Sequence, residues 1–176
     1  GGKIMILVTG DTHGDWIHRL NMDSFPEQRE MTKDDYVIVL GDFGIWNDTS
    51  QQRYNLNWLK ERNFTTLFID GNHSNFDLLN SYPVSEWHGG KVHFINDSVI
   101  HLMRGQVFNI DDKSFFTFGG AQSQDISDGI LEIDDPRLRI WRKDRDKMYR
   151  VNHISWWKEE MPNEEEMSEG IKNLAS

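Results

Sequence analysis

Cysteine is absent from the 176 residues of the chain. Its absence excludes a disulfide-bonded scaffold, a thiolate zinc site, an iron–sulfur cluster and a cysteine nucleophile. Long apolar runs are absent too, and none approaches the roughly 20 residues that a transmembrane helix needs. The first apolar run, residues 4–8, is too short for the apolar region of a signal peptide. We therefore expect a cytoplasmic protein that does not enter a membrane.

Positive charge is also scarce, because 19 Lys and Arg face 29 Asp and Glu, for a formal net charge of −10. This balance argues against a protein that coats nucleic acid, although it leaves room for a local basic patch. What is present is a hydrophobic content of 37%, enough for the core of one domain, and seven histidines among many aspartates. These residues leave one metal chemistry open, with nitrogen and oxygen ligands.

Three short apolar runs rich in Val and Ile mark the first 70 residues, at 4–8, 36–40 and 65–69. Continuous hydrophobicity over such short runs is typical of strands buried on both faces. A helix is predicted over residues 50–62, where apolar side chains recur at helical spacing, and a shorter one over 76–80. The alternation of strands and helices predicts a parallel sheet.

The second half of the chain has the pattern of an antiparallel meander. Strand-like runs lie at residues 92–95, 99–103, 106–110 and 114–118. The pair Asp111-Asp112 between two of them predicts a hairpin turn. Residues 122–150 are polar and predicted to be irregular. A helix is predicted at the C-terminal end, with Asn163 as its N-cap and Glu166 completing a capping box.

A short polar signature directly follows each of the three predicted parallel strands. The signatures are Gly10-Asp11-Thr12-His13-Gly14, Gly41-Asp42-Phe43-Gly44 and Asp70-Gly71-Asn72-His73-Ser74. Because ligands bind beyond the carboxyl ends of parallel strands, we expect the three signatures to converge. Asp, His and Asn offer oxygen and nitrogen ligands suited to Mn²⁺, iron or Zn²⁺. A lone Gly-Asp is usually a turn, but three signatures in this order indicate a metal site.

These motifs resemble those of the calcineurin-like metallophosphoesterases, in which Gly-Asp-x-His, Gly-Asp and Gly-Asn-His each follow a strand. Together with Gly119-Gly120-Ala121, the run is similar to small bacterial and phage members of that superfamily over essentially the whole chain. The resemblance implies an α/β fold, a four-layer α/β/β/α sandwich, and two divalent ions of manganese, iron or zinc. It implies a hydrolase that cleaves a phosphomonoester or phosphodiester through a metal-bridging hydroxide. The substrate would be a phosphorylated small molecule, a nucleotide or a phosphoprotein.

The resemblance also implies a role for each motif residue. Asp11 and His13 would hold the first metal ion, and Asp42 would bridge both ions through its two oxygens. Asn72 would bind the second ion through its amide oxygen. His73 would be catalytic and not a ligand, because it would hydrogen-bond the phosphate and stabilise or protonate the leaving oxygen.

The sequence departs from the family pattern in two places. Ser74 stands where the family often has Asp or Glu, and little consequence is expected. The family's further lone His and its Gly-His-x-His signature, which supply three more ligands, do not follow. We therefore expect residues 1–176 to form a single, C-terminally truncated metallophosphoesterase-like domain whose half-site binds metal weakly. The alternative function is that of a weak or inactive fragment that acts as a binding module.

The other histidines offer few replacements for those ligands. His153 comes last in the chain but has no second ligand at useful spacing. His93 and His101 are expected to be packing or edge residues of the strands, and His88 to lie in a loop. His18 is placed on a first helix, which precedes the one predicted over residues 50–62.

Two further features of the C-terminal third are open to two interpretations. Basic residues between 137 and 150 alternate with acids, which favours a solvated surface over a phosphate-binding patch. Trp141 and the pair at 156–157 are expected to pack in the core. If apolar surface is left uncovered there, it would favour a homodimer.

Overall fold

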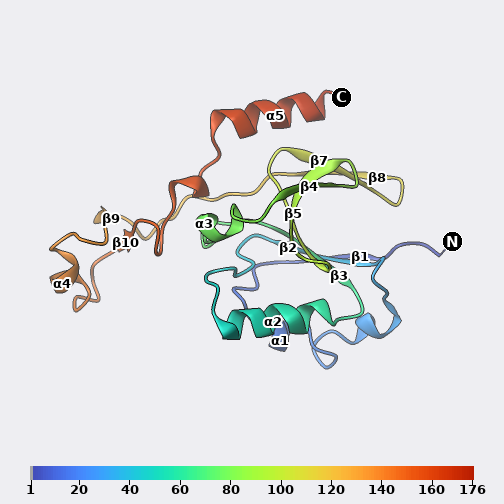
Figure 1. The fold of residues 1–176 in the computed structure, drawn as a ribbon, viewed down its shortest axis with the longest axis horizontal. Helices are drawn as coiled ribbons and strands as arrows, with labels where there is room; N and C mark the ends of the chain where they lie inside the picture. Colours follow the sequence, from blue (N-terminus) through green and yellow to red (C-terminus); the bar gives the residue numbers. More distant parts are fainter. Residues whose placement is uncertain (1) are drawn as a thin grey trace.

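A mixed six-stranded sheet forms the centre of the computed structural model, which describes residues 2–176 (Figure 1). The strand order is β1-β2-β3-β6-β5-β4. Strands β1, β2, β3 and β6 pair in parallel, whereas β5 pairs antiparallel with both β6 and β4. The six strands are β1 (Ile6–Thr9), β2 (Tyr36–Leu40), β3 (Thr65–Ile69), β4 (Val84–Trp87), β5 (Gly90–Asn96) and β6 (Val99–Leu102). The predicted α/β class and its parallel first half are confirmed.

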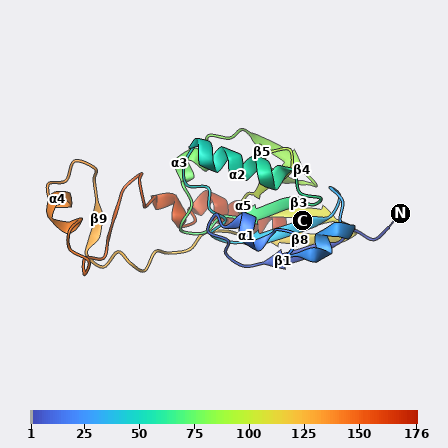
Figure 2. The same ribbon diagram turned by 90° about the horizontal axis from the view of Figure 1, so that it is seen from below.

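Helices and a hairpin cover the two faces of this sheet (Figures 1 and 2). Helices α1 (Trp16–Arg19) and α2 (Ser50–Lys60) lie on one face. The hairpin of β7 (Gln106–Ile110) and β8 (Lys113–Thr117) lies on the other, and α5 (Glu164–Leu174) contacts β7 from outside. The layers therefore run helix, sheet, hairpin, helix.

Strand β2 shows why a continuous apolar run is needed at the centre of the sheet. Val37 and Val39 enter the apolar cluster that includes Leu59 of α2. Tyr36 and Ile38 point the other way, into the cluster beneath the hairpin. Because successive side chains of a strand alternate between faces, both sets must be apolar.

The predicted meander is wrong in one respect, because it breaks after β6. β6 pairs with β3 inside the main sheet, whereas β7 and β8 form a separate two-stranded sheet. The hairpin turn is confirmed: Asp111 and Asp112 have φ angles of 51° and 59°, both positive as a type I′ turn requires. Strand β4 has no predicted counterpart, since it is a four-residue edge strand with alternate side chains exposed.

Residues 121–157 form an arm that extends away from the sheet (Figures 1 and 2). The expectation of an irregular segment is wrong here, because β9 (Gly129–Leu131) and β10 (Tyr149–Val151) pair in parallel around α4 (Leu138–Trp141). A small apolar cluster of Leu131, Leu138 and Val151 holds them together.

The remaining helices are short, whereas the longer α5 begins at the predicted residue. They are a 3₁₀ helix over Pro26–Glu30, α3 (Phe76–Leu79) and a 3₁₀ turn over Lys158–Glu160. At α5 the capping box of Asn163 and Glu166 is present in both directions. Across residues 2–176, no helix is both long and apolar enough to cross a membrane.

Candidate metal centre

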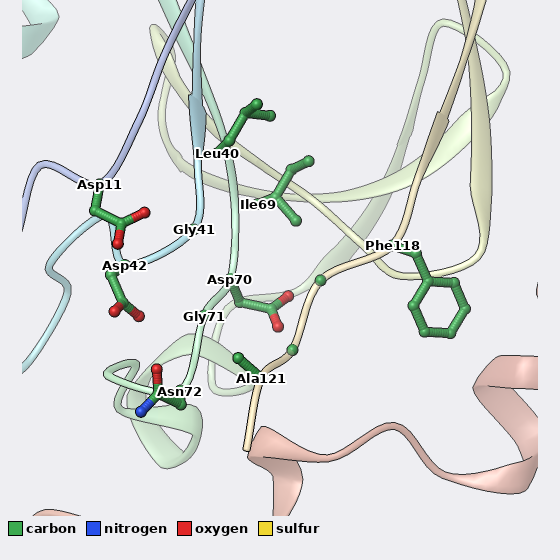
Figure 3. A pocket seen from close by; sticks show the side chains of 12 residues that line it. Asp11, Leu40, Gly41, Asp42, Ile69, Asp70, Gly71, Asn72, Phe118 and Ala121 are labelled. Carbon is green, nitrogen blue, oxygen red and sulfur yellow. The ribbon is translucent and has the colours of Figure 1, made fainter. Parts of the chain in front are cut away.

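The three polar signatures meet at the edge of the sheet where β1, β2 and β3 end (Figure 3). One ligand atom each from Asp11, His13 and Asp42 lies within 4.8 Å of the other two. Within residues 2–176, no other group of three or more acidic, His or Cys side chains is so close together. The donor set of two carboxylates and an imidazole suits a divalent transition-metal ion.

The backbone of two of these residues adopts the left-handed conformation. His13 has φ of 48° and Asp42 has φ of 37°. Hydrogen bonds join the two loops, since the His13 N–H donates to the Asp42 carbonyl at 2.8 Å and the Gly14 N–H to the Phe43 carbonyl at 2.9 Å. Strained residues of this kind persist where the surrounding structure holds them and are concentrated at functional sites.

Gly71 allows the third loop to approach the second. A Cβ atom at this position would collide with the carboxylate of Asp42. In the space left by the missing side chain, the His73 N–H donates to Asp42 Oδ1 at 2.9 Å. Asp42 is 7% exposed, so glycine here serves both the burial of its carboxylate and the direction it faces.

The amide of Asn72 has its orientation set by a buried hydrogen-bond chain. The Ser123 hydroxyl donates to Glu160 Oε2 at 2.6 Å, which uses its one hydrogen. It must therefore accept from Asn72 Nδ2, 3.1 Å away. The amide oxygen of Asn72 is left free and faces toward Asp42 (Figure 3). An oxygen so placed fits the role of a metal ligand.

His73 lies beside the group of Asp11, His13 and Asp42. Its ring meets that of His13 edge to face, with centroids 5.7 Å apart. Its carbonyl accepts a hydrogen bond from Trp46 Nε1 at 2.8 Å. With its N–H bound to Asp42, the backbone of His73 is held on both sides.

Asp70, which precedes the third motif, turns away from the candidate metal ligands (Figure 3). Burial alone would raise the pKa of its carboxyl group, but hydrogen bonds and charge from His101 and Arg104 hold that pKa below its usual range. Arg104 also pairs with Glu166 of α5 at 3.0 Å. Asp70 therefore links the sheet to the outer helix, and it lines a cavity of about 390 Å³ together with Asp11, Asp42 and Asn72.

The family model for calcineurin-like phosphoesterases matches residues 4–173. The chain belongs to the calcineurin-like phosphoesterase family. The resemblance drawn from the motifs is thereby confirmed. Neither the curated proteins nor the solved structures offer a match to the chain.

Calcineurin-like phosphoesterases hydrolyse phosphoesters with the help of divalent metal ions, and the Asp-His-Asp group is a candidate site for such ions. The other histidines lie outside this group. His88 occupies the turn between β4 and β5, and His153 pairs with Asp77 of α3 at 2.8 Å. His93 and His101 are buried, as expected for packing residues, but they also hydrogen-bond to each other.

Three residues near the calcineurin-like site are not indicated by any sequence motif. Ser123 and Glu160 orient Asn72 from 51 and 88 positions further along the chain. Arg150 lies beside His73, with its Nη1 atom 3.4 Å from Nδ1 of the ring. Ser123 and Arg150 lie in the segment predicted to be irregular, and Glu160 lies beyond it. Arg150 ends the basic run that is interpreted above as solvated surface, and the other two residues have no signal in the sequence beyond their polarity.

Proposed function

We propose that the chain is a metal-dependent phosphoesterase that hydrolyses a phosphomonoester or phosphodiester at this edge of the sheet. The convergence of Asp11, His13 and Asp42 within 4.8 Å, in a chain of this family, carries the proposal. In this proposal, Asp11 and His13 would hold one divalent ion, Asn72 would hold a second through its free amide oxygen, and Asp42 would contribute a carboxylate oxygen to each. Manganese is the ion to test first.

When bound, two such ions supply positive charge that neutralises the phosphate and lowers the pKa of a coordinated water. The chain itself orients the reactants. The cavity of about 390 Å³ next to the carboxylates admits a phosphoryl group with part of its ester. His73, which the proposal leaves free of metal, donates a hydrogen bond to the phosphate or the leaving oxygen, where negative charge develops. The proposed substrate is a phosphorylated small molecule, a nucleotide or a phosphoprotein.

The experiment measures Mn²⁺ binding by calorimetry and hydrolysis of p-nitrophenyl phosphate and bis(p-nitrophenyl) phosphate. Loss of an outer-sphere partner of a metal ligand typically costs 10–100-fold in affinity or activity, so Asp42→Asn should lower turnover by about 100-fold or more. His73→Ala should lower turnover but leave Mn²⁺ binding intact. The matched control is Asp97→Asn, because Asp97 is exposed and pairs with Lys60 away from the site.

The two readouts separate the proposed enzyme from the alternative. Mn²⁺ binding that depends on Asp42, without hydrolysis of either ester, would identify a binding module. If neither binding nor hydrolysis exceeds that of Asp42→Asn, the proposed metal site is wrong.

A further inference from the structure

We propose that Arg150 is a positioning residue that presents the Nε2–H of His73 to the substrate; this inference rests on the phosphoesterase function proposed above. Arg150 belongs to β10 in the arm, 77 positions from His73 in the sequence. No motif of the family pattern described above includes it.

The guanidinium of Arg150 is held in a fixed position. Its Nε and Nη2 donate to the two carboxylate oxygens of Asp125 at 2.9 and 2.7 Å. Its Nη1 donates to the carbonyl of Ser155 at 2.9 Å. The side chain is 13% exposed, so the paired, planar group has little freedom to move.

The contact between Arg150 and His73 determines which ring nitrogen carries the proton. Nη1 of Arg150 lies 3.4 Å from Nδ1 of His73. A guanidinium donates only and keeps its protons, so Nδ1 must be the acceptor. In a neutral imidazole the proton then lies on Nε2. Ser74, the neighbour in sequence, is buried but makes no hydrogen bond to this ring among the described residues.

The function of the Nε2–H follows from this arrangement. As the oxygen of the attacking water bonds to phosphorus, the bond between phosphorus and the ester oxygen breaks, and the Nε2–H hydrogen-bonds to that ester oxygen and stabilises its negative charge. The proton stays on Nε2, and the released oxygen takes a proton from water. A neutral imidazole can act as an electrophile in this way. His73 and Arg150 also line a cavity of about 190 Å³ with Trp46 and Trp157, which gives room for the leaving group.

The arm is fastened where this contact is made. Asp77 of α3 accepts hydrogen bonds from His153 Nδ1 at 2.8 Å and from Trp157 Nε1 at 2.7 Å. These bonds tie the end of the arm to the helix that follows His73. The arm therefore carries Arg150 to a defined place beside the ring.

The first test compares two esters with different leaving groups. A poor leaving group, such as that of an alkyl phosphate, develops more charge on its oxygen and depends more on the Nε2–H. Arg150→Ala should therefore lower kcat by about 10–100-fold for the alkyl ester, and less for p-nitrophenyl phosphate, with KM unchanged. In a His73→Ala background, Arg150→Ala should cause no further loss. Arg137→Ala is the matched control, because Arg137 makes a similar two-point pair with Asp135 on the same arm.

The second test does not depend on turnover. Nitrogen-15 NMR of the histidine rings should show the proton of His73 on Nε2 in the wild type and a mixture of tautomers in Arg150→Ala. If Arg150→Ala fails to fold, Asp125→Asn releases the guanidinium while keeping it in the chain, and should show the same split between esters.

Three results would overturn the inference. One is a proton on Nδ1 of His73 in the wild type. Another is a rise in KM that is equal for all esters, which would mean that Arg150 binds the substrate directly. The third is a loss of kcat that adds fully to that of His73→Ala. A wild type without Mn²⁺-dependent turnover would instead refute the proposed function, and the NMR measurement would still test the contact.

Discussion

The buried pair of His93 and His101 predicts a specific loss of stability in mild acid. The two residues face each other across β5 and β6, and are 3% and 4% exposed. Their Nδ1 atoms lie 3.0 Å apart, and His101 Nε2 lies 2.8 Å from Asp70 Oδ1. Only one of the two Nδ1 atoms can carry the proton of this hydrogen bond, so the two histidines cannot both be protonated on Nδ1.

Burial, followed by the nearby charge of His101, lowers the pKa of His93 to about 4 from an ordinary value of 6.5. Because the folded pKa lies below the unfolded one, the associated stability is present above about pH 6.5 and is lost as the pH falls toward 4. Between these pH values His93 binds a proton in the unfolded chain but not in the folded protein, so acid favours unfolding. At about 1.4 kcal/mol per pKa unit, the loss between pH 7 and pH 4.5 is about 2 kcal/mol.

The assay is urea unfolding at pH 7, 5.5 and 4.5, for the wild type and for His93→Gln, which cannot titrate. The variant should be less stable at pH 7. The difference in the free energy of unfolding between the two proteins, here called the gap, should narrow by about 2 kcal/mol by pH 4.5. Asp70, which contacts His101 and is paired with Arg104, is present in both proteins, so the comparison isolates the loss of His93. A gap that stays constant across the three pH values would refute the reasoning.

Three further predictions concern the site and the arm. Gly71→Ala places a methyl group against the carboxylate of Asp42 and should weaken Mn²⁺ binding by about 10–100-fold in calorimetry. Gly10→Ala is the control, because a Cβ atom there would meet open space. Equal effects of the two substitutions would contradict the steric argument. Ser123→Ala frees the amide of Asn72 and leaves Oε2 of the buried Glu160 without a hydrogen bond, while Oε1 keeps the bond from the backbone N–H of residue 123. The free energy of unfolding should therefore fall by about 1–3 kcal/mol, and Mn²⁺ should bind more weakly; unchanged stability would contradict the importance of this hydrogen bond. Asp77→Ala removes the acceptor that ties down the arm, so protease cleavage within residues 121–157 should become faster; an unchanged cleavage rate would show that the tie contributes little.

Strands β2 and β3 of the main sheet follow closely from sequence because they are buried on both faces. β2 and β3 begin and end at the predicted residues, since a five-residue apolar run bounded by polar signatures leaves little freedom. Strand β4 and the pair β9–β10 escape prediction because they are short and partly exposed, and tertiary contacts decide their structure.

The same division applies to the candidate site. Asp11, His13 and Asp42 follow their strands directly, so topology alone brings them to one edge. Arg150 and Ser123 reach this edge through the fold of the arm, from 77 and 51 positions away from their partners. Such long-range pairings produce no periodic pattern in the sequence, so only the three-dimensional structure shows them.

The arm has its own apolar cluster, and this affects how the protein unfolds. Leu131, Leu138 and Val151 pack together apart from the two clusters that bury the sheet. A small cluster opens at a lower free energy than a large one, so hydrogen exchange should find the arm amides less protected than those of β2 and β3. During such an opening, Asp11 and Asp42 stay together at the edge of the sheet, whereas the ring of His73 loses its contact with Arg150. Metal binding by the carboxylates and the orientation of the His73 ring therefore depend on two units of different local stability.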